Sequence, residues 1–212
     1  MTAQTAPCSA ERPVRVRVAT TADAAALAAF AARTFTATYA RGGVGDVAAS
    51  RPEDVRAYVD AHFTPARQRT ELGDPAIVTV VADLAGDPGV DAGTSDAASG
   101  DASPWVGYAQ LRLVPRAEAP PPAVCVGAHP RELLRFYVDH AWQGRGVADA
   151  LMHAVLARAR AEPGGADPIW LAVYQANARA VAFYRRHGFV VAGAGTFTMG
   201  GETQHDWLMR AG

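Results

Sequence analysis

The chain has 212 residues, of which 50% are hydrophobic and 19% charged, a size and composition typical of one soluble globular domain. Its formal net charge of −1 argues against a nucleic acid bound through bulk electrostatics. Cys8 and Cys125 are too few for a disulfide framework and lack metal-ligand spacing, and no apolar run resembles a signal peptide or a membrane span, so we expect a cytoplasmic protein without metal or membrane partner.

Alternating and helically spaced apolar residues predict seven strands and four helices. In chain order the expected elements are a strand (14–18), two helices (22–39 and 52–63), three strands (76–84, 105–114 and 131–139), a helix (145–161), a strand (168–174), a helix (177–187) and a closing hairpin (189–198 and 204–210). Pro65 and the turn at 73–75 are expected to end the second helical region. This order predicts an α/β fold, a mixed sheet with helices on both faces.

The chain is expected to form one domain over residues 13–212. Residues 1–12 are expected to be a disordered N-terminus. Residues 85–104 are rich in Gly, Asp, Ser and Ala and almost free of large apolar side chains, so we expect a flexible insertion between two paired strands. Prolines make residues 115–130 an irregular connection.

The most informative segment is Gln143-Gly144-Arg145-Gly146-Val147-Ala148, which joins the expected strand 131–139 to the helix after it. A glycine turn exposes backbone N–H groups, and a helix N-terminus adds positive potential, so this arrangement predicts a phosphate site. Glycine pairs at such turns also occur for packing reasons alone. A dinucleotide-binding loop is disfavoured, because the glycines come late in the chain and the third glycine of G-x-G-x-x-G is missing.

Two motifs resemble those of the GNAT superfamily of N-acetyltransferases. Residues 143–148 match its Q/R-x-x-G-x-G/A, and residues 177–189 match its N-x-x-A-x-x-F-Y-x-x-x-G-F. The resemblance covers residues 14–210 and implies the acyl-CoA N-acyltransferase fold, with a mostly antiparallel sheet that splays between its two central parallel strands. Acetyl-CoA is the implied cosubstrate. Segments 35–39 and 197–209 are also similar to bacterial polyamine N-acetyltransferases of the PaiA type.

The resemblance assigns the cosubstrate contacts. Backbone N–H groups of Gln143, Gly144, Arg145, Gly146, Val147 and Ala148 would hold the pyrophosphate, and Arg145 could also touch a phosphate through its side chain. The backbone of Phe136, Tyr137 and Val138 would pair with the pantetheine arm as an added strand does. Asn177 would contact a pantetheine amide, although an asparagine before a helix is also an ordinary N-cap.

The resemblance also assigns two catalytic groups. The N–H of Val138 would polarise the thioester carbonyl and stabilise the oxyanion. The Tyr184 phenol would lie near the thioester sulfur and protonate the departing thiolate as general acid. A tyrosine on an amphipathic helix is more often a core residue, and that alternative stays open for Tyr184. Phe183 is expected to pack in the core.

The acceptor pocket is expected, by family analogy, to be formed by the loop from Tyr39 to Ser50 and the closing hairpin from Phe197 to Asp206. Tyr39 would lie against an aliphatic amine, and Glu53 and Glu202 would attract its positive charge. The general base stays undetermined among acidic and histidine side chains: Glu53, Asp54, Asp139, Glu202, Asp206, His140 and His62. Many PaiA relatives carry Trp-Glu where this chain has Tyr174-Gln175, so a glutamate base does not carry over to that position.

The expected function is direct transfer of acetyl from acetyl-CoA to a primary amine of a small molecule such as a polyamine. The alternatives within the enzyme class are acetylation of a protein N-terminus, an amino acid or an antibiotic amine. A non-catalytic acyl-CoA-binding sensor would keep residues 143–148 without needing the acid or an acceptor pocket. A nucleotide-binding module is the third alternative. Dimers are common in the family, so a homodimer is an expectation of the same kind.

Overall fold

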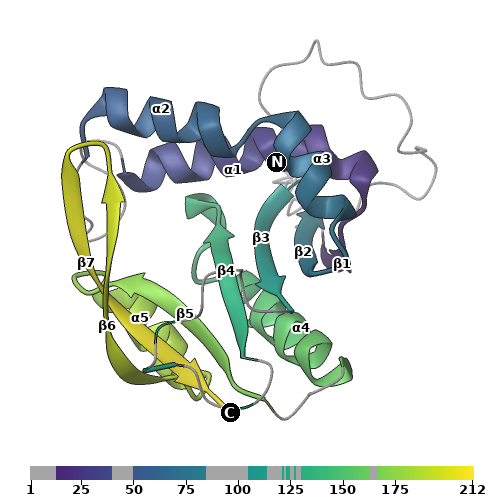
Figure 1. Cartoon of the computed structure of the whole chain (residues 1–212). Helices are drawn as coiled ribbons and strands as arrows, with labels where there is room; N and C mark the ends of the chain where they lie inside the picture. Colours follow the sequence, from purple (N-terminus) through teal and green to yellow (C-terminus); the bar gives the residue numbers. More distant parts are fainter. Residues whose placement is uncertain are drawn as a thin grey trace, which may run out of the picture.

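A computed structural model describes residues 13–39, 50–84, 105–113, 121, 123–124, 127, 130–162 and 167–212. The expected disordered N-terminus, the expected insertion at 85–104 and most of the loop from Tyr39 to Ser50 lie outside the described residues. The described strands form one seven-stranded sheet in the order β1-β2-β3-β4-β5-β7-β6 (Figure 1). The expected α/β fold is confirmed, whereas the division into a single domain stays a prediction.

The strands lie within a few residues of their expected positions. They are β1 (Val14–Val18), β2 (Ile77–Leu84), β3 (Trp105–Arg112), β4 (Arg131–Val138), β5 (Ile169–Tyr174), β6 (Val190–Met199) and β7 (Glu202–Ala211). All hydrogen-bonded neighbours run antiparallel except β4 and β5, which are parallel. All residues of β2 and β3 except the last are buried, because helices cover both faces of this half of the sheet.

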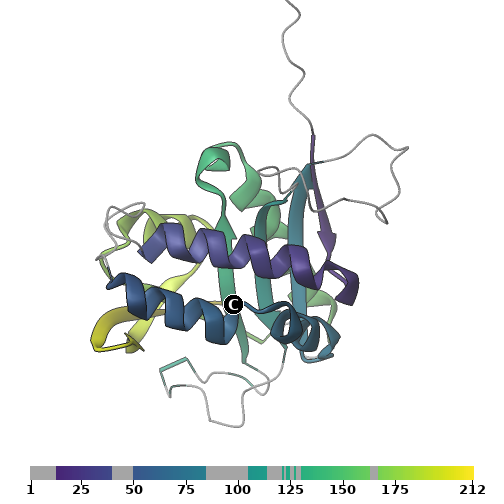
Figure 2. The same ribbon diagram turned by 90° about the horizontal axis from the view of Figure 1, so that it is seen from above.

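Helices cover the two faces of the sheet unequally. They are α1 (Ala24–Tyr39), α2 (Pro52–His62), α3 (Pro65–Gly73), α4 (Val147–Ala161) and α5 (Ala178–Arg186), with short 3₁₀ helices at Thr21–Asp23 and His140–Trp142. Seen from above, α1 and α2 lie side by side across one face (Figure 2). The opposite face carries α4 against β2 and β3, and α5 beside β5.

The expectation that Pro65 only ends a helix is wrong. Pro65 occupies the first turn of α3, a separate helix that the sequence analysis did not predict. Proline is tolerated there because the first N–H groups of a helix have no partner within it. The Thr64 hydroxyl accepts the Arg67 N–H at 3.2 Å and caps the new helix.

Helix α4 begins two residues later than expected, at Val147. Gly144 and Gly146 adopt φ values of 77° and 80°, in the left-handed region, so the chain between them cannot be α-helical. Gly146 is therefore the N-cap of α4. The two glycines turn the chain out of the 3₁₀ helix at His140–Trp142 and into α4 with their N–H groups at the surface.

The core is divided by the sheet into two clusters. On the face of α4 and α5, the buried residues include Leu133, Val147, Leu151, Leu171, Val173, Tyr184, Phe189 and Met209. On the face of α1 and α2, they include Leu27, Phe30, Phe35, Val55, Phe63, Val81, Tyr108 and Met199. Because side chains alternate along each strand, neighbouring residues of a strand join different clusters.

Candidate active site

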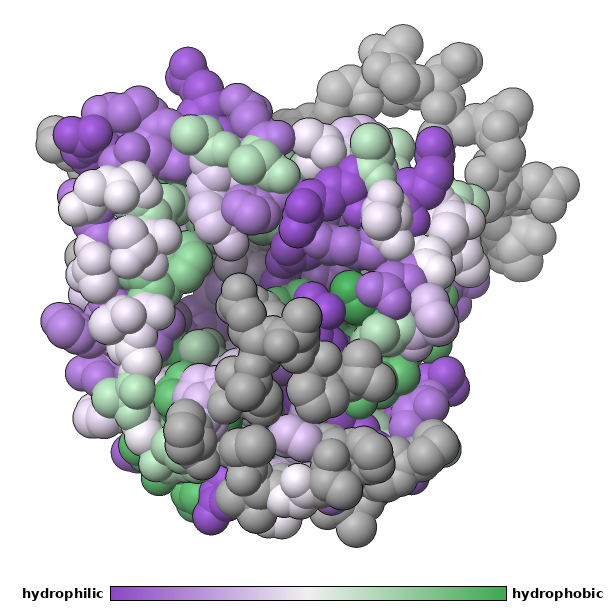
Figure 3. Space-filling view, in the orientation of Figure 1, coloured by the Kyte–Doolittle hydropathy of each residue, from purple (hydrophilic) through white to green (hydrophobic). Residues whose placement is uncertain are grey.

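The parallel strands β4 and β5 pair only at their beginnings. Arg131 is opposite Ile169 and Glu132 is opposite Trp170, and beyond these two pairs the strands diverge. The expected splay is therefore present (Figure 1). The space-filling view in the same orientation shows the surface hollowed between β4 and the hairpin of β6 and β7 (Figure 3).

The edge of β4 that faces this opening has unpaired backbone groups. The Asp139 N–H donates to the Val106 carbonyl of β3 at 2.9 Å. Since successive residues of a strand direct their N–H groups to opposite sides, the Val138 N–H points away from β3 and toward the opening. A polar, extended molecule could therefore pair with β4 where β5 has moved away.

The loop after β4 presents a group of N–H donors. The Gln143 N–H donates to the His140 carbonyl at 3.3 Å and the Ala150 N–H to the Gly146 carbonyl at 3.0 Å. Among the described residues, the N–H groups of Gly144, Gly146, Val147 and Ala148 find no acceptor, as expected for a turn that leads into the first turn of a helix. These donors and the positive end of α4 fit a diphosphate.

Side chains fix this loop to the strand edge. The Gln143 amide donates from Nε2 to the Val138 carbonyl at 3.3 Å, and its Oε1 accepts from the Arg179 guanidinium of α5. The Arg145 guanidinium lies over the Trp142 ring, 5.4 Å from its centroid. The motif glutamine thus connects β4, the loop and α5, three elements that border the opening.

Asn177 is the N-cap of α5. Its Oδ1 accepts the Ala180 N–H at 3.0 Å, which confirms the capping interpretation. The cap uses only the oxygen of the amide, so the Nδ2 donors are left for another partner. Its position at the end of β5 places this amide at the border of the opening.

Tyr184 lies on the face of α4 and α5 and is only 8% exposed. Its ring packs edge-on against Phe136 at 6.2 Å and Phe189 at 5.8 Å between centroids, so it is part of the core. Its hydroxyl makes no hydrogen bond to another described residue. Burial raises the pKa of this phenol above its ordinary value, so the hydroxyl keeps its proton at neutral pH. Phe183 packs partly buried beside it, as expected.

The opposite face of the opening is aromatic. Tyr39, at the end of α1, contacts Phe35 at 4.5 Å and Phe197 of β6 at 6.3 Å between centroids. Tyr58 of α2 stacks on Phe35 at 4.6 Å with an interplanar angle of 6°. Tyr137 points to the same face and packs against this group. The predicted acceptor residue Tyr39 therefore joins α1 to the hairpin. Its aromatic group includes Phe197 of the hairpin expected to border the pocket, and also Tyr58, which was not predicted as an acceptor residue.

The other two predicted acceptor residues lie apart from these rings. The Glu53 side chain is 65% exposed and forms an ion pair with Arg51 at 3.3 Å. Glu202 is exposed at the start of β7, and its charge acts on Arg51 as well. Both carboxylates thus border the N-terminus of α2, where Arg51 offsets part of their charge.

The structure separates the remaining candidate bases. Asp54 pairs with Arg51 at 3.1 Å, and Asp139 pairs with Arg33 at 3.0 Å while also accepting the Ala141 N–H. His140 is exposed beside Asp139. His62 lies against the Tyr58 ring at 4.2 Å between centroids, and burial lowers its pKa. Only one further candidate is buried, and it is Asp206.

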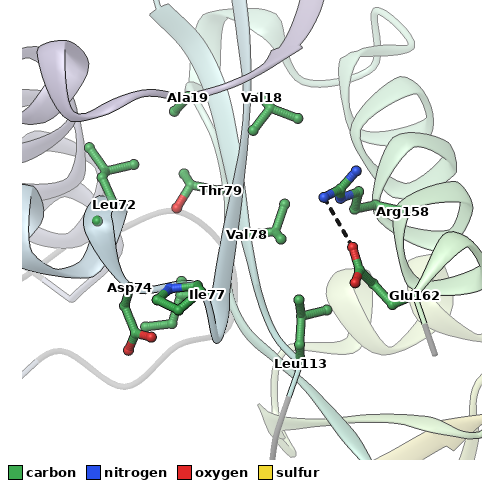
Figure 4. A pocket seen from close by; sticks show the side chains of 12 residues that line it. Val18, Ala19, Leu72, Asp74, Ile77, Val78, Thr79, Leu113, Arg158 and Glu162 are labelled. Carbon is green, nitrogen blue, oxygen red and sulfur yellow. Dashed lines mark ion pairs between the residues drawn. The ribbon is translucent and has the colours of Figure 1, made fainter. Parts of the chain in front are cut away.

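A second hollow lies far from the opening, between α3, the beginning of β2 and the end of α4 (Figure 4). It measures about 330 Å³ and is lined partly by Asp74, Arg158 and Glu162. Arg158 and Glu162 form an ion pair at 3.0 Å, so their charges largely offset each other there. We therefore place the functional site at the opening between β4 and β5.

Two further features concern the described part of the chain. None of its helices combines the length and the apolar character needed to cross a membrane. No cluster of three or more His, Cys, Asp or Glu side chains suited to hold a metal ion is found among these residues.

Comparisons with known proteins agree with this geometry. The model of the acetyltransferase (GNAT) family matches residues 82–189. An uncharacterized N-acetyltransferase of Mycobacterium tuberculosis is 33% identical over 189 residues, which cover 88% of this chain and 96% of that protein. Mycobacterium bovis has an uncharacterized N-acetyltransferase with the same identity and coverage.

Solved structures share the fold. The PaiA N-acetyltransferase of Thermoplasma acidophilum in complex with coenzyme A gives a TM-score of 0.62 at 16% identity, over 94% of this chain and 98% of that one. NAA60 of Arabidopsis thaliana in complex with acetyl-CoA gives 0.61 at 15% identity, over 93% and 97%. Together with the family match and the mycobacterial relatives, the splayed sheet and its donor loop lead to one conclusion: the chain belongs to the GNAT acetyltransferase family and is an acetyl-CoA-dependent N-acetyltransferase.

Proposed function

We propose that this enzyme transfers acetyl from acetyl-CoA directly to the primary amine of a small, positively charged molecule, with polyamines as the first class to test. The observation that carries the proposal is the aromatic group of Tyr39, Tyr58 and Phe197 on the acceptor side of the opening. Aromatic faces attract alkylammonium groups and also cover their methylene chains. The exposed carboxylates of Glu53 and Glu202 at the nearby end of α2 would draw a cation toward this side.

Different groups of the chain bind and orient the cosubstrate in this proposal. The N–H groups between Gly144 and Ala148 hold the pyrophosphate, whereas the Gln143 N–H is already bonded to the His140 carbonyl, and Arg145 adds positive charge beside it. The unpaired edge of β4 from Phe136 to Val138, together with Asn177, orients the pantetheine arm. The Val138 N–H, which faces the opening, polarises the thioester carbonyl.

Tyr184 is the proposed proton donor to the departing sulfur. Because its pKa is raised by burial, the phenol holds its proton at neutral pH and can donate a hydrogen bond as negative charge develops on the thiolate. Its location on the face of α4 and α5 supports this role, since the acceptor rings lie on the other face. The amine would then be bound from one side of the sheet, and the leaving sulfur would be protonated from the other.

The test is a release assay for free CoA across a panel of amines: spermidine, spermine, amino acids, an aminoglycoside and short peptides. We expect the polyamines to give the largest kcat/KM. Preference for a peptide with a free N-terminus would instead support N-terminal acetylation. CoA binding without release on any amine would support the sensor, and a thermal shift with ATP or NAD but not CoA would contradict the proposal altogether.

A further inference from the structure

One candidate base differs from all the others in its surroundings. Asp206 lies on β7, directly opposite Tyr174 at the end of β5. On the same strand, the side chains of Trp207 and Met209 pack into the cluster of α4 and α5. The alternation along the strand therefore points the Asp206 side chain to the other face, where α1 and α2 lie.

Asp206 is buried, at 8% exposure, and its carboxylate has no hydrogen bond or ion pair with any other described residue. A buried carboxylate without a partner costs free energy, and most folds avoid it. Two other acids near the opening have cations as partners, Arg51 for Asp54 and Arg33 for Asp139. The oxygens of this carboxylate are not among the fully enclosed polar atoms of the described chain, so a cation from solvent can reach them.

The surroundings of Asp206 connect it to the acceptor rings. Its negative charge raises the pKa of the Tyr39 phenol, after the larger effect of burial, and Tyr39 in turn acts on Tyr137 of β4. Around Asp206 the described titratable groups are Tyr39 from α1, Tyr174 across on β5 and His205 next in the chain, whereas β6 offers Gly195 opposite it. His205 alone lowers the pKa of Asp206. Burial outweighs it and raises that pKa to about 6.

We infer that Asp206 binds the ammonium group of the acceptor and takes its proton before attack. This inference rests on the proposed function and assigns the general base that the sequence left open. A primary ammonium resembles that of lysine, with a pKa near 10.4, so the acceptor enters protonated at neutral pH. The partnerless carboxylate attracts that charge, and the rings of Tyr39 and Phe197 lie beside it.

The protons and bonds balance in three steps. The ammonium gives one proton to the Asp206 carboxylate, which releases it to solvent after turnover. The free amine forms a C–N bond to the thioester carbonyl carbon, whose oxygen lies by the Val138 N–H. The C–S bond then breaks, and the sulfur receives a proton from the Tyr184 hydroxyl. The nitrogen loses its second proton, so Tyr184 can return to its protonated form. The products are the N-acetylated amine, free CoA and one proton.

The decisive experiment is the pH profile of kcat/KM for the wild-type enzyme, Asp206→Asn and Asp206→Glu on the best amine of the panel. We expect the wild-type profile to fall below about pH 6. Asp206→Asn should lose about 100-fold in kcat at pH 7 and regain rate toward alkaline pH, where the amine is already neutral. Asp206→Glu should restore part of the rate together with an acid limb. Asp60→Asn, an exposed carboxylate of α2, is the matched control and should change nothing.

Structural damage is excluded by a separate readout. CoA should bind Asp206→Asn with the wild-type dissociation constant, because the carboxylate lies on the face away from the donor loop. An Asn variant with wild-type kcat and an unchanged acid limb would overturn the inference while leaving the proposed function in place. Absence of CoA release from the wild-type enzyme on every amine would overturn both. If Asp206→Asn does not fold, Asp206→Glu carries the same pH comparison.

Discussion

The two sides of the opening between β4 and β5 are built from different groups, main-chain groups on one side and side chains on the other. The proposed cosubstrate side uses mainly main-chain groups from one continuous segment, residues 136–148, with two left-handed glycines in its loop. The acceptor side uses side chains from α1 and α2 and from β6 and β7, and more than half of the chain separates these two pairs of elements. Backbone donors suit a cosubstrate common to a whole family, whereas side chains can be exchanged one at a time to suit different amines.

The largest effect that would sharpen this comparison concerns Tyr184, the proposed proton donor to the departing sulfur. Tyr184→Phe keeps the ring that packs against Phe136 and Phe189 and removes only the hydroxyl. We expect kcat to fall by about 100-fold, the usual size of a general acid contribution. Steady-state kinetics measure this, with calorimetric CoA binding and the melting temperature expected to stay unchanged. Wild-type kcat in this variant would show that Tyr184 is only a core residue.

A glycine substitution tests whether the loop conformation is what binds the cosubstrate. Gly146→Ala places a side chain at φ 80°, where an added Cβ meets no atom within 4 Å, so its cost is backbone strain alone. Left-handed backbone costs about 1–2 kcal/mol for a non-glycine residue. We expect CoA to bind about tenfold more weakly.

Gly188→Ala is the matched control for that strain. Gly188 has φ 85° and equally open space, but it follows α5 and not the donor loop. Both variants should lose similar stability in thermal melts, and only Gly146→Ala should lose CoA affinity. Equal losses of affinity would mean that general destabilisation, and not the loop, sets CoA binding.

The difference between the two sides also explains how much of the site could be predicted from the sequence. The donor loop is local: a strand, two glycines and a helix start within ten residues leave a pattern that sequence alone reveals. The acceptor side is not local, and nothing in the pattern around Asp206 marks it as buried, because its burial depends on α1 packing over a distant hairpin. Glu53 looked equally suitable in sequence, yet the neighbouring Arg51 pairs with it.

Helix α3 was missed for a related reason. Pro65 is a helix breaker in an interior and a helix former at the first turn, and only the preceding Thr64 cap distinguishes the two cases. The splay between β4 and β5 was expected from family resemblance and not from the residues, since no local feature of a strand reveals where its partner leaves it.

A smaller effect separates two roles of Asn177. Asp at this position can still cap α5 by accepting the Ala180 N–H, but it lacks the amide donor. We expect Asn177→Asp to keep the melting temperature and to weaken CoA binding about fivefold, the value of one hydrogen bond near 1 kcal/mol. Asn177→Ala should lose the cap as well and melt about 2–4 °C lower. If the Asp variant binds CoA as the wild type does, Asn177 serves the helix alone.

The smallest expected effect lies on the acceptor side and concerns stability. The pKa of Asp206 in the folded protein is raised to about 6, above the value of an unfolded aspartate near 3.9. The folded state therefore binds more protons between these values, and the stability it gains below pH 4 is lost as the pH rises through 6. Asp206→Asn cannot ionise, so it should escape this loss.

We expect Asp206→Asn to melt about 2–4 °C above the wild type at pH 7.5, a gain on the order of 1 kcal/mol after allowance for solvent screening. At pH 4 most of this difference should disappear, because the folded carboxyl is then protonated and only about half of the unfolded one is ionised. Thermal melts at both pH values measure the difference. A wild type that is more stable than the variant at pH 7.5 would mean that the carboxylate already has a partner in the free enzyme. The acceptor side would then have a stabilising partner before the amine binds, which the donor loop lacks before CoA binds. The comparison between the two sides would have to include that partner.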